Sequence, residues 1–139
     1  MEASDILLPV FVMGMLTVVM LIWMVATRLP AMTAAGIEAQ DAQDTSVLKS
    51  LPPRVRSVAD NYNHLFEQPT LFYAVAIAIA VLGHVDSLHV QCAWIFTLAR
   101  IAHSILQATV NIVLARFTLF MVAWAALTVM MVRELIAIV

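Results

Sequence analysis

Hydrophobic residues fill four long stretches of this 139-residue chain, and polar residues are concentrated between them. A helix needs roughly 20 mostly apolar residues to cross a bilayer. The pattern predicts four such helices, over residues of about 6–28, 54–83, 88–112 and 116–138. None of the four shows the alternating polarity of a membrane β-strand. We therefore expect an all-α integral membrane protein.

The connections between these helices predict their arrangement. Residues 29–53 form the one long polar stretch, where Pro30 is expected to close the first helix and Pro52–Pro53 to precede the second. The other two connections are short, which makes consecutive helices antiparallel neighbours. We expect one domain over residues 1–139, a four-helix up-and-down transmembrane bundle.

Basic residues predict the orientation of the bundle in the membrane. They gather on the side that holds the 29–53 connection, as Arg28, Lys49, Arg54, Arg56 and Arg116. Because cytoplasmic connections are enriched in Lys and Arg, we expect this connection in the cytoplasm and both termini on the non-cytoplasmic side.

The composition excludes several classes of function. Hydrophobic residues make up 63% of the chain and charged residues 12%, against about 25% charged in soluble domains. The net charge of −2 argues against a nucleic-acid partner and leaves membrane lipids as the expected surroundings. Cys92 is the only cysteine, and His84 and His89 beside Asp86 have no further ligand nearby, so no metal site is expected.

A polar face runs along the third predicted helix. Its members recur three or four residues apart, as Arg100, His103, Ser104, Gln107 and Asn111. A charge at mid-bilayer costs at least roughly 2.5–3.5 kcal/mol, so Arg100 is expected to point into the bundle or a wet cavity. The alternative is that these side chains only join helices, at roughly 0.6 kcal/mol each.

A second polar face lies at the start of the second predicted helix. Its members are spaced four, three and four residues apart, as Arg56, Asp60, Asn63 and Glu67. Pro69 is expected to bend the helix just beyond them. We expect the two faces to point toward one another, with Arg28 and Arg116 nearby, and to form a cationic pocket for a small, mostly anionic ligand. Whether His64 edges this pocket or contacts lipid headgroups stays open.

These segments resemble the MAPEG superfamily, the membrane-associated proteins in eicosanoid and glutathione metabolism, and its bacterial-type members in particular. The resemblance is carried by "RVRSVADNYNHLFEQPTLF" (Arg54–Phe72), by "ARIAHSILQ" (Ala99–Gln107) and by Arg116. It implies a homotrimer of four-helix subunits. Glutathione would bind at the subunit interfaces near the cytoplasmic side.

The resemblance also implies roles for individual residues. Glutathione would be held by Arg28, Arg56, Asn63, Glu67, Arg100, His103 and Gln107. Arg116 would be catalytic, because an adjacent cation lowers the pKa of a thiol from its ordinary value near roughly 8.5. The implied activity is that of a transferase or peroxidase in which the thiolate attacks a lipophilic small molecule drawn from the bilayer.

Two departures from the family pattern support an alternative function. Asn63 and Glu67 are four residues apart where family enzymes usually have three, and Gln107 stands where many members have tyrosine. The alternative is a non-catalytic MAPEG-fold protein that binds lipid or assists another membrane protein. An ion or proton pathway is disfavoured, because the polar faces have no continuation in Ala74–Leu82.

Overall fold

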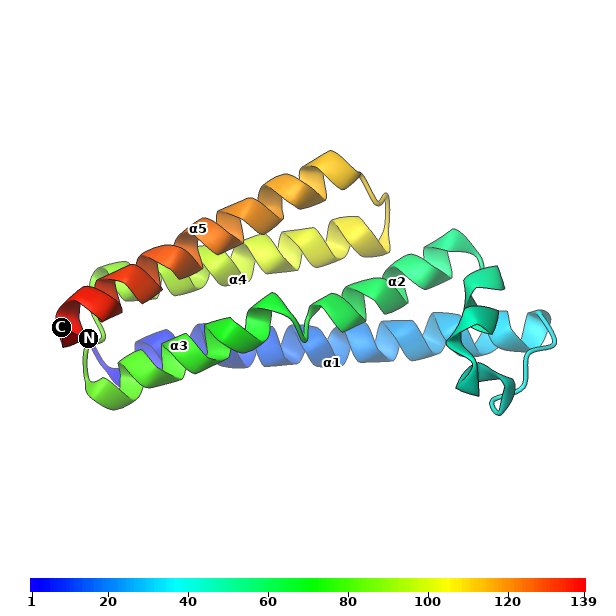
Figure 1. Ribbon diagram of the computed structural model, residues 1–139, viewed down its shortest axis with the longest axis horizontal. Helices are drawn as coiled ribbons and strands as arrows, with labels where there is room; N and C mark the ends of the chain where they lie inside the picture. The colour runs from blue at the N-terminus through cyan, green and yellow to red at the C-terminus, as the bar shows by residue number, and fades with distance from the viewer.

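The computed structural model describes residues 1–139 and is built of helices alone (Figure 1). Two short 3₁₀ helices lie in the long connection, and five α-helices make up the rest. Their bounds are α1 Ala3–Ala34, η1 Asp41–Gln43, η2 Thr45–Ser50, α2 Pro53–His64, α3 Gln68–Leu82, α4 Ser87–Ala108 and α5 Val113–Ile138.

The helices form the expected up-and-down bundle, in which α2 and α3 together take the place of the second predicted helix. α4 and α5 make the most extensive helix pair, and α1 packs against α2, α3 and α4. Both termini lie at one end of the bundle, and the long connection that carries η1 and η2 lies at the other (Figure 1).

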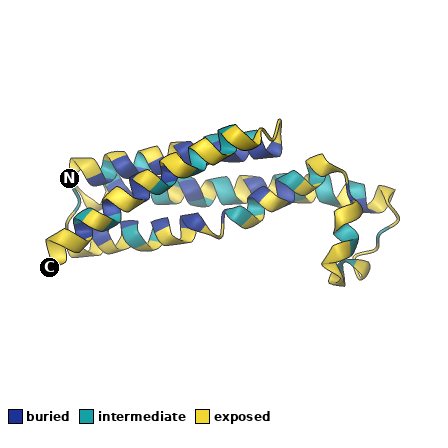
Figure 2. Cartoon of the chain, turned by 45° about the horizontal axis from the view of Figure 1, so that its top comes forward, coloured by how far each residue is buried: buried dark blue, intermediate teal, exposed yellow.

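The outer surface of the bundle is apolar. Phe11 of α1 is 71% exposed and Leu114 of α5 is 76% exposed, an arrangement that suits contact with lipid rather than water. Exposed positions follow the outer faces of the helices along the bundle (Figure 2). Three segments are long and apolar enough to cross a membrane, namely Ala3–Ala34, Pro53–Leu82 and Val113–Ile138. The chain is therefore an integral, multi-pass membrane protein, with α4 as a fourth helix beside these three.

Close packing holds the helices together, because lipid tails are as apolar as the core side chains and burial alone gives little advantage. Phe72 of α3 stacks on Phe96 of α4 with ring centroids 4.2 Å apart. Ala76 of α3, Ala93 of α4 and Ala123 of α5 are fully buried.

Three helix boundaries differ from the predicted ones. α1 does not end near residue 28 but continues through Pro30 to Ala34. A proline removes one backbone donor, and the rest of the helical hydrogen bonding resumes one turn later, so Pro30 does not stop the helix. α4 ends at Ala108 and α5 begins at Val113, so the connection between them is Thr109–Ile112.

Candidate functional site

The chain breaks between α2 and α3, as the position of Pro69 predicts. α2 ends at His64, and Pro69 lies in the first turn of α3. Proline has no N–H for the carbonyl of Leu65, so the helix cannot run straight through this point. The break leaves the His64 carbonyl able to accept a hydrogen bond from Arg100 Nη2 of α4, at 3.4 Å.

The polar face of α4 points into the bundle. Arg100 is 1% exposed, and His103, Ser104 and Gln107 are buried with it. Asn111 lies beyond the end of the helix and is exposed. The predicted inward orientation of Arg100 is thus confirmed, in agreement with the high cost of a cation against lipid.

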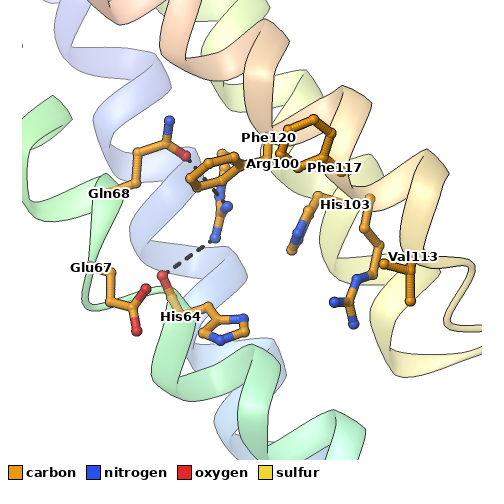
Figure 3. A pocket seen from close by; sticks show the side chains of 9 residues that line it. His64, Glu67, Gln68, Arg100, His103, Val113, Phe117 and Phe120 are labelled. Atoms are coloured by element: carbon orange, nitrogen blue, oxygen red, sulfur yellow. Dashed lines mark hydrogen bonds between the residues drawn. The ribbon is translucent and has the colours of Figure 1, made fainter.

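A cavity of about 300 Å³ opens beside this face. The α2–α3 break forms one side, and α4 and α5 form the other (Figure 3). Arg100 lies between the two sides, with Glu67 and Gln68 on one and His103 on the other (Figure 3). The lining residues are His64, Glu67, Gln68, Arg100, His103, Val113, Arg116, Phe117 and Phe120.

Arg100 has only long hydrogen bonds within the chain. Besides the His64 carbonyl, its Nη1 lies 3.4 Å from Gln68 Oε1, and its Nε has no partner. Turning the Gln68 amide over would let its oxygen accept from the indole N–H of Trp124 at 3.3 Å in place of Arg100. Charge-assisted hydrogen bonds are normally about 2.7–2.9 Å long, so the guanidinium keeps most of its capacity for an anionic partner.

The cavity carries uncompensated positive charge. All ion pairs of the chain lie at the opposite end of the bundle, among His84, Asp86, His89, Arg133 and Glu134. Neither Arg100 nor Arg116 pairs with a carboxylate, although Glu67 lines the same cavity. Buried cations are normally paired, so this site suits an anionic ligand that supplies the missing partners.

Arg116 occupies an unfavourable position in its helix. It lies in the first turn of α5, where the backbone N–H groups leave a partial positive charge that disfavours a cation. Its Nη1 donates to Asn111 Oδ1, and its Nε is buried without a partner. Because the helix does not favour a cation here, the placement of Arg116 points to a role in the cavity.

The structure brings together four of the predicted site residues and leaves four outside. Glu67, Arg100, His103 and Arg116 line the cavity. Gln107 is buried behind it, with its amide oxygen 3.3 Å from His64 Nδ1. The other three predicted residues do not line it, namely Arg28 on α1 and Arg56 and Asn63 on α2.

The face that α2 turns toward α4 differs from the predicted one. Arg56, Asp60 and Asn63 are exposed. The expectation that they point toward the polar face of α4 in the same chain is therefore wrong. Asn111 Nδ2 instead donates to Ser57 Oγ at 3.0 Å, and Gln107 meets His64. The reason is apolar packing: Val58 and Leu65 are buried in the core and fix the rotation of α2.

Four lining residues, Gln68, Val113, Phe117 and Phe120, were not predicted from the sequence, and the place of His64 was left open. A signal for part of this set was present. The residues on the inner side of the segment are spaced four, three and four apart, as Ser57, Asn61, His64 and Gln68. This second polar stripe has the same periodicity as the predicted stripe of Arg56, Asp60, Asn63 and Glu67.

A separate polar cluster closes the end of the bundle near the termini. His84 Nδ1 lies 2.6 Å from Glu134 Oε1, and Arg133 Nη2 lies 2.5 Å from Asp86 Oδ2. Asp86 Oδ1 also accepts from the backbone N–H of His89 at 2.8 Å and caps α4. Nowhere in the chain do three or more ligating side chains form a group that could hold a metal ion.

Replacing Asp86 by alanine is expected to destabilise the bundle by about 1 kcal/mol, the ordinary value of a helix cap. The His89 N–H, followed by Arg133, lowers the pKa of the Asp86 carboxyl below its ordinary value of 3.8. A carboxyl with a lowered folded-state pKa stabilises the fold above its unfolded-state pKa and stops doing so as the pH falls. Thermal unfolding in detergent should therefore show a gap between the two proteins that narrows as the pH falls below about 4 and closes below the folded-state pKa of Asp86. A gap that is independent of pH would contradict this account.

Comparison with protein families matches residues 6–136 to the MAPEG family. The matched region contains every residue that lines the cavity. Comparison with curated proteins and with solved structures gives no significant match.

Proposed function

The chain belongs to the MAPEG family, and on that premise we propose that it is a glutathione-dependent membrane enzyme, a transferase or peroxidase that acts on lipophilic electrophiles. Membership of this family agrees with a membrane role related to glutathione. The activity, the ligand and the residue roles that follow are the proposal.

The observation that carries the proposal is the unpaired charge in the cavity. Glutathione has two carboxylates, one ammonium group, two amides and a thiol. Arg100 and Arg116 lack anionic partners, Glu67 lacks a cationic one, and Gln68 presents an amide. Arg100 can hold a carboxylate of glutathione through two parallel hydrogen bonds, and Glu67 can form an ion pair with its ammonium group.

Arg116 is the residue we assign to the thiol. Its guanidinium has four remaining donors beyond the one that Asn111 accepts. A cation beside the sulfur favours the thiolate, which is the reactive nucleophile. In a transferase reaction the thiolate forms a carbon–sulfur bond, the leaving group departs with the bonding electron pair, and the thiol proton goes to water.

The second substrate is expected against the apolar wall of the cavity. Val113, Phe117 and Phe120 come from α5, whose outer residues are exposed where lipid would lie. Phe117 is itself 58% exposed, so it bridges the cavity and the lipid-facing surface. A lipophilic electrophile would reach the thiolate from the bilayer along this wall.

A trimer would account for the predicted residues that lie outside the cavity. Arg56 and Asn63 are exposed on α2, and Arg28 has a buried Nε without a partner. In a homotrimer with glutathione at the subunit interfaces, such side chains complete the site of a neighbouring subunit. We place this site near the cytoplasm, because the basic residues are concentrated at this end of the bundle.

The test is an activity measurement on detergent-purified protein with glutathione and a chromogenic aryl halide. We expect turnover that saturates with glutathione and exceeds the reaction in protein-free micelles. The Arg54→Ala variant should keep this turnover, because Arg54 is an exposed arginine outside the cavity. No turnover, together with lipid co-purified in the cavity, would favour the non-catalytic alternative.

A further inference from the structure

Asn111 has an uncommon backbone conformation in the turn between α4 and α5. Its φ of 52° lies in the left-handed region, and it is the one residue other than glycine that does so in this chain. The backbone N–H of Asn111 donates to the Leu106 carbonyl at 2.7 Å and closes the end of α4. Asparagine tolerates this region better than most residues, but glycine tolerates it best.

The side chain of Asn111 makes two hydrogen bonds that glycine could not make. Its Nδ2 donates to Ser57 Oγ of α2 at 3.0 Å, and its Oδ1 accepts from Arg116 Nη1 of α5. The guanidinium of Arg116 can only donate, so it takes the amide oxygen and leaves the amide N–H for Ser57. One side chain thus connects the end of α4 to α2 and to the cavity arginine.

We infer that Asn111 is a positioning residue for Arg116, which it holds with the guanidinium directed into the cavity. The inference rests on the proposed function, in which Arg116 stabilises the glutathione thiolate. An arginine side chain has about 2 kcal/mol of rotamer entropy, and a fixed acceptor removes much of that freedom before the ligand binds. A cation that is already in place lowers the thiol pKa more than one that must be ordered on binding.

The Asn111→Gly variant separates positioning from folding. Glycine keeps the turn and relieves the left-handed backbone, which offsets the loss of the two exposed side-chain hydrogen bonds, so the fold should be about as stable as in the wild type. Only the two side-chain hydrogen bonds are lost. A change in function without a loss of stability therefore reports on the amide itself.

The measurement is the apparent pKa of the thiol of bound glutathione, followed by the ultraviolet absorbance of the thiolate in detergent-purified protein. We expect Asn111→Gly to raise this pKa by about 0.5, the effect of losing one modest hydrogen bond. The other charged or titratable groups lining the cavity, Arg100, His103, His64 and Glu67, are unchanged in the variant. Asp86→Ala is the matched control, because it removes a capping side chain at the opposite end and should leave the thiol pKa unchanged.

A double-mutant cycle tests whether Asn111 acts through Arg116. In an Arg116→Ala background, Asn111→Gly should cause no further change in the thiol pKa. An unchanged pKa in Asn111→Gly alone, or an equal shift in both backgrounds, would overturn the inference and leave the proposed function intact. If the wild type binds no glutathione, or Arg116→Ala leaves the thiol pKa as it was, the proposed function fails and the inference falls with it.

Discussion

Replacing Arg116 by alanine is expected to lower kcat with glutathione by about 10²-fold, the usual effect of removing one electrostatic donor from a reacting anion. A cation favours the thiolate, so its removal raises the pKa of the bound thiol toward the ordinary value near roughly 8.5. The rising part of the pH–rate profile should move to higher pH by as much as the pKa of the bound thiol rises. KM should change much less than kcat, because the role assigned to Arg116 is at the sulfur.

Two further variants make this result specific. Arg116→Lys should recover part of the activity, since it restores the charge without the planar fork of donors. Arg54→Ala removes the same charge from an exposed position outside the cavity and should leave the profile unchanged. A pH–rate profile that is identical in the wild type and in Arg116→Ala would remove Arg116 from the chemistry.

Replacing Arg100 by methionine is expected to weaken glutathione binding by about 10- to 100-fold, because a charge-assisted hydrogen bond contributes about 1.5–3 kcal/mol. The same change should not destabilise the protein without ligand. Arg100 is 1% exposed and unpaired, so its removal relieves the desolvation of a buried charge. The His64 carbonyl loses one donor but keeps a bond from the backbone N–H of Glu67 at 3.3 Å.

Weaker glutathione binding without a loss of stability would identify Arg100 as a ligand-binding rather than a structural residue. Thermal unfolding of the two proteins would be compared with and without glutathione. We expect the unliganded Met variant to melt no lower than the wild type, and to gain less stability than the wild type from the same concentration of glutathione. A large loss of stability in the unliganded variant, with binding retained, would show that Arg100 serves the fold.

The sequence predicted most of the fold because the relevant signals are local. Runs of apolar residues long enough to cross a bilayer lie along the chain, and Pro69 fixes the α2–α3 break through its missing N–H. The ends of α1 and α4 were less predictable. Pro30 lies within a helix that continues past it, and the end of α4 depends on the left-handed conformation of Asn111.

The site was predicted only in part, for a reason that concerns helix rotation. Periodicity indicates which residues share a face, but two polar stripes on one helix do not say which faces inward. Val58 and Leu65 decide it, because their burial turns Ser57, Asn61 and His64 toward α4 and leaves Arg56 and Asn63 exposed. On α4 a single polar face exists, and there Arg100 and His103 were placed correctly.

The most direct test of the proposed site is a calorimetric titration of glutathione into the detergent-purified protein, with Arg100→Met measured alongside. We expect saturable binding to the wild type and a clear loss of affinity in the variant. An absence of binding to the wild type at millimolar glutathione, or equal affinity in the two proteins, would contradict this expectation.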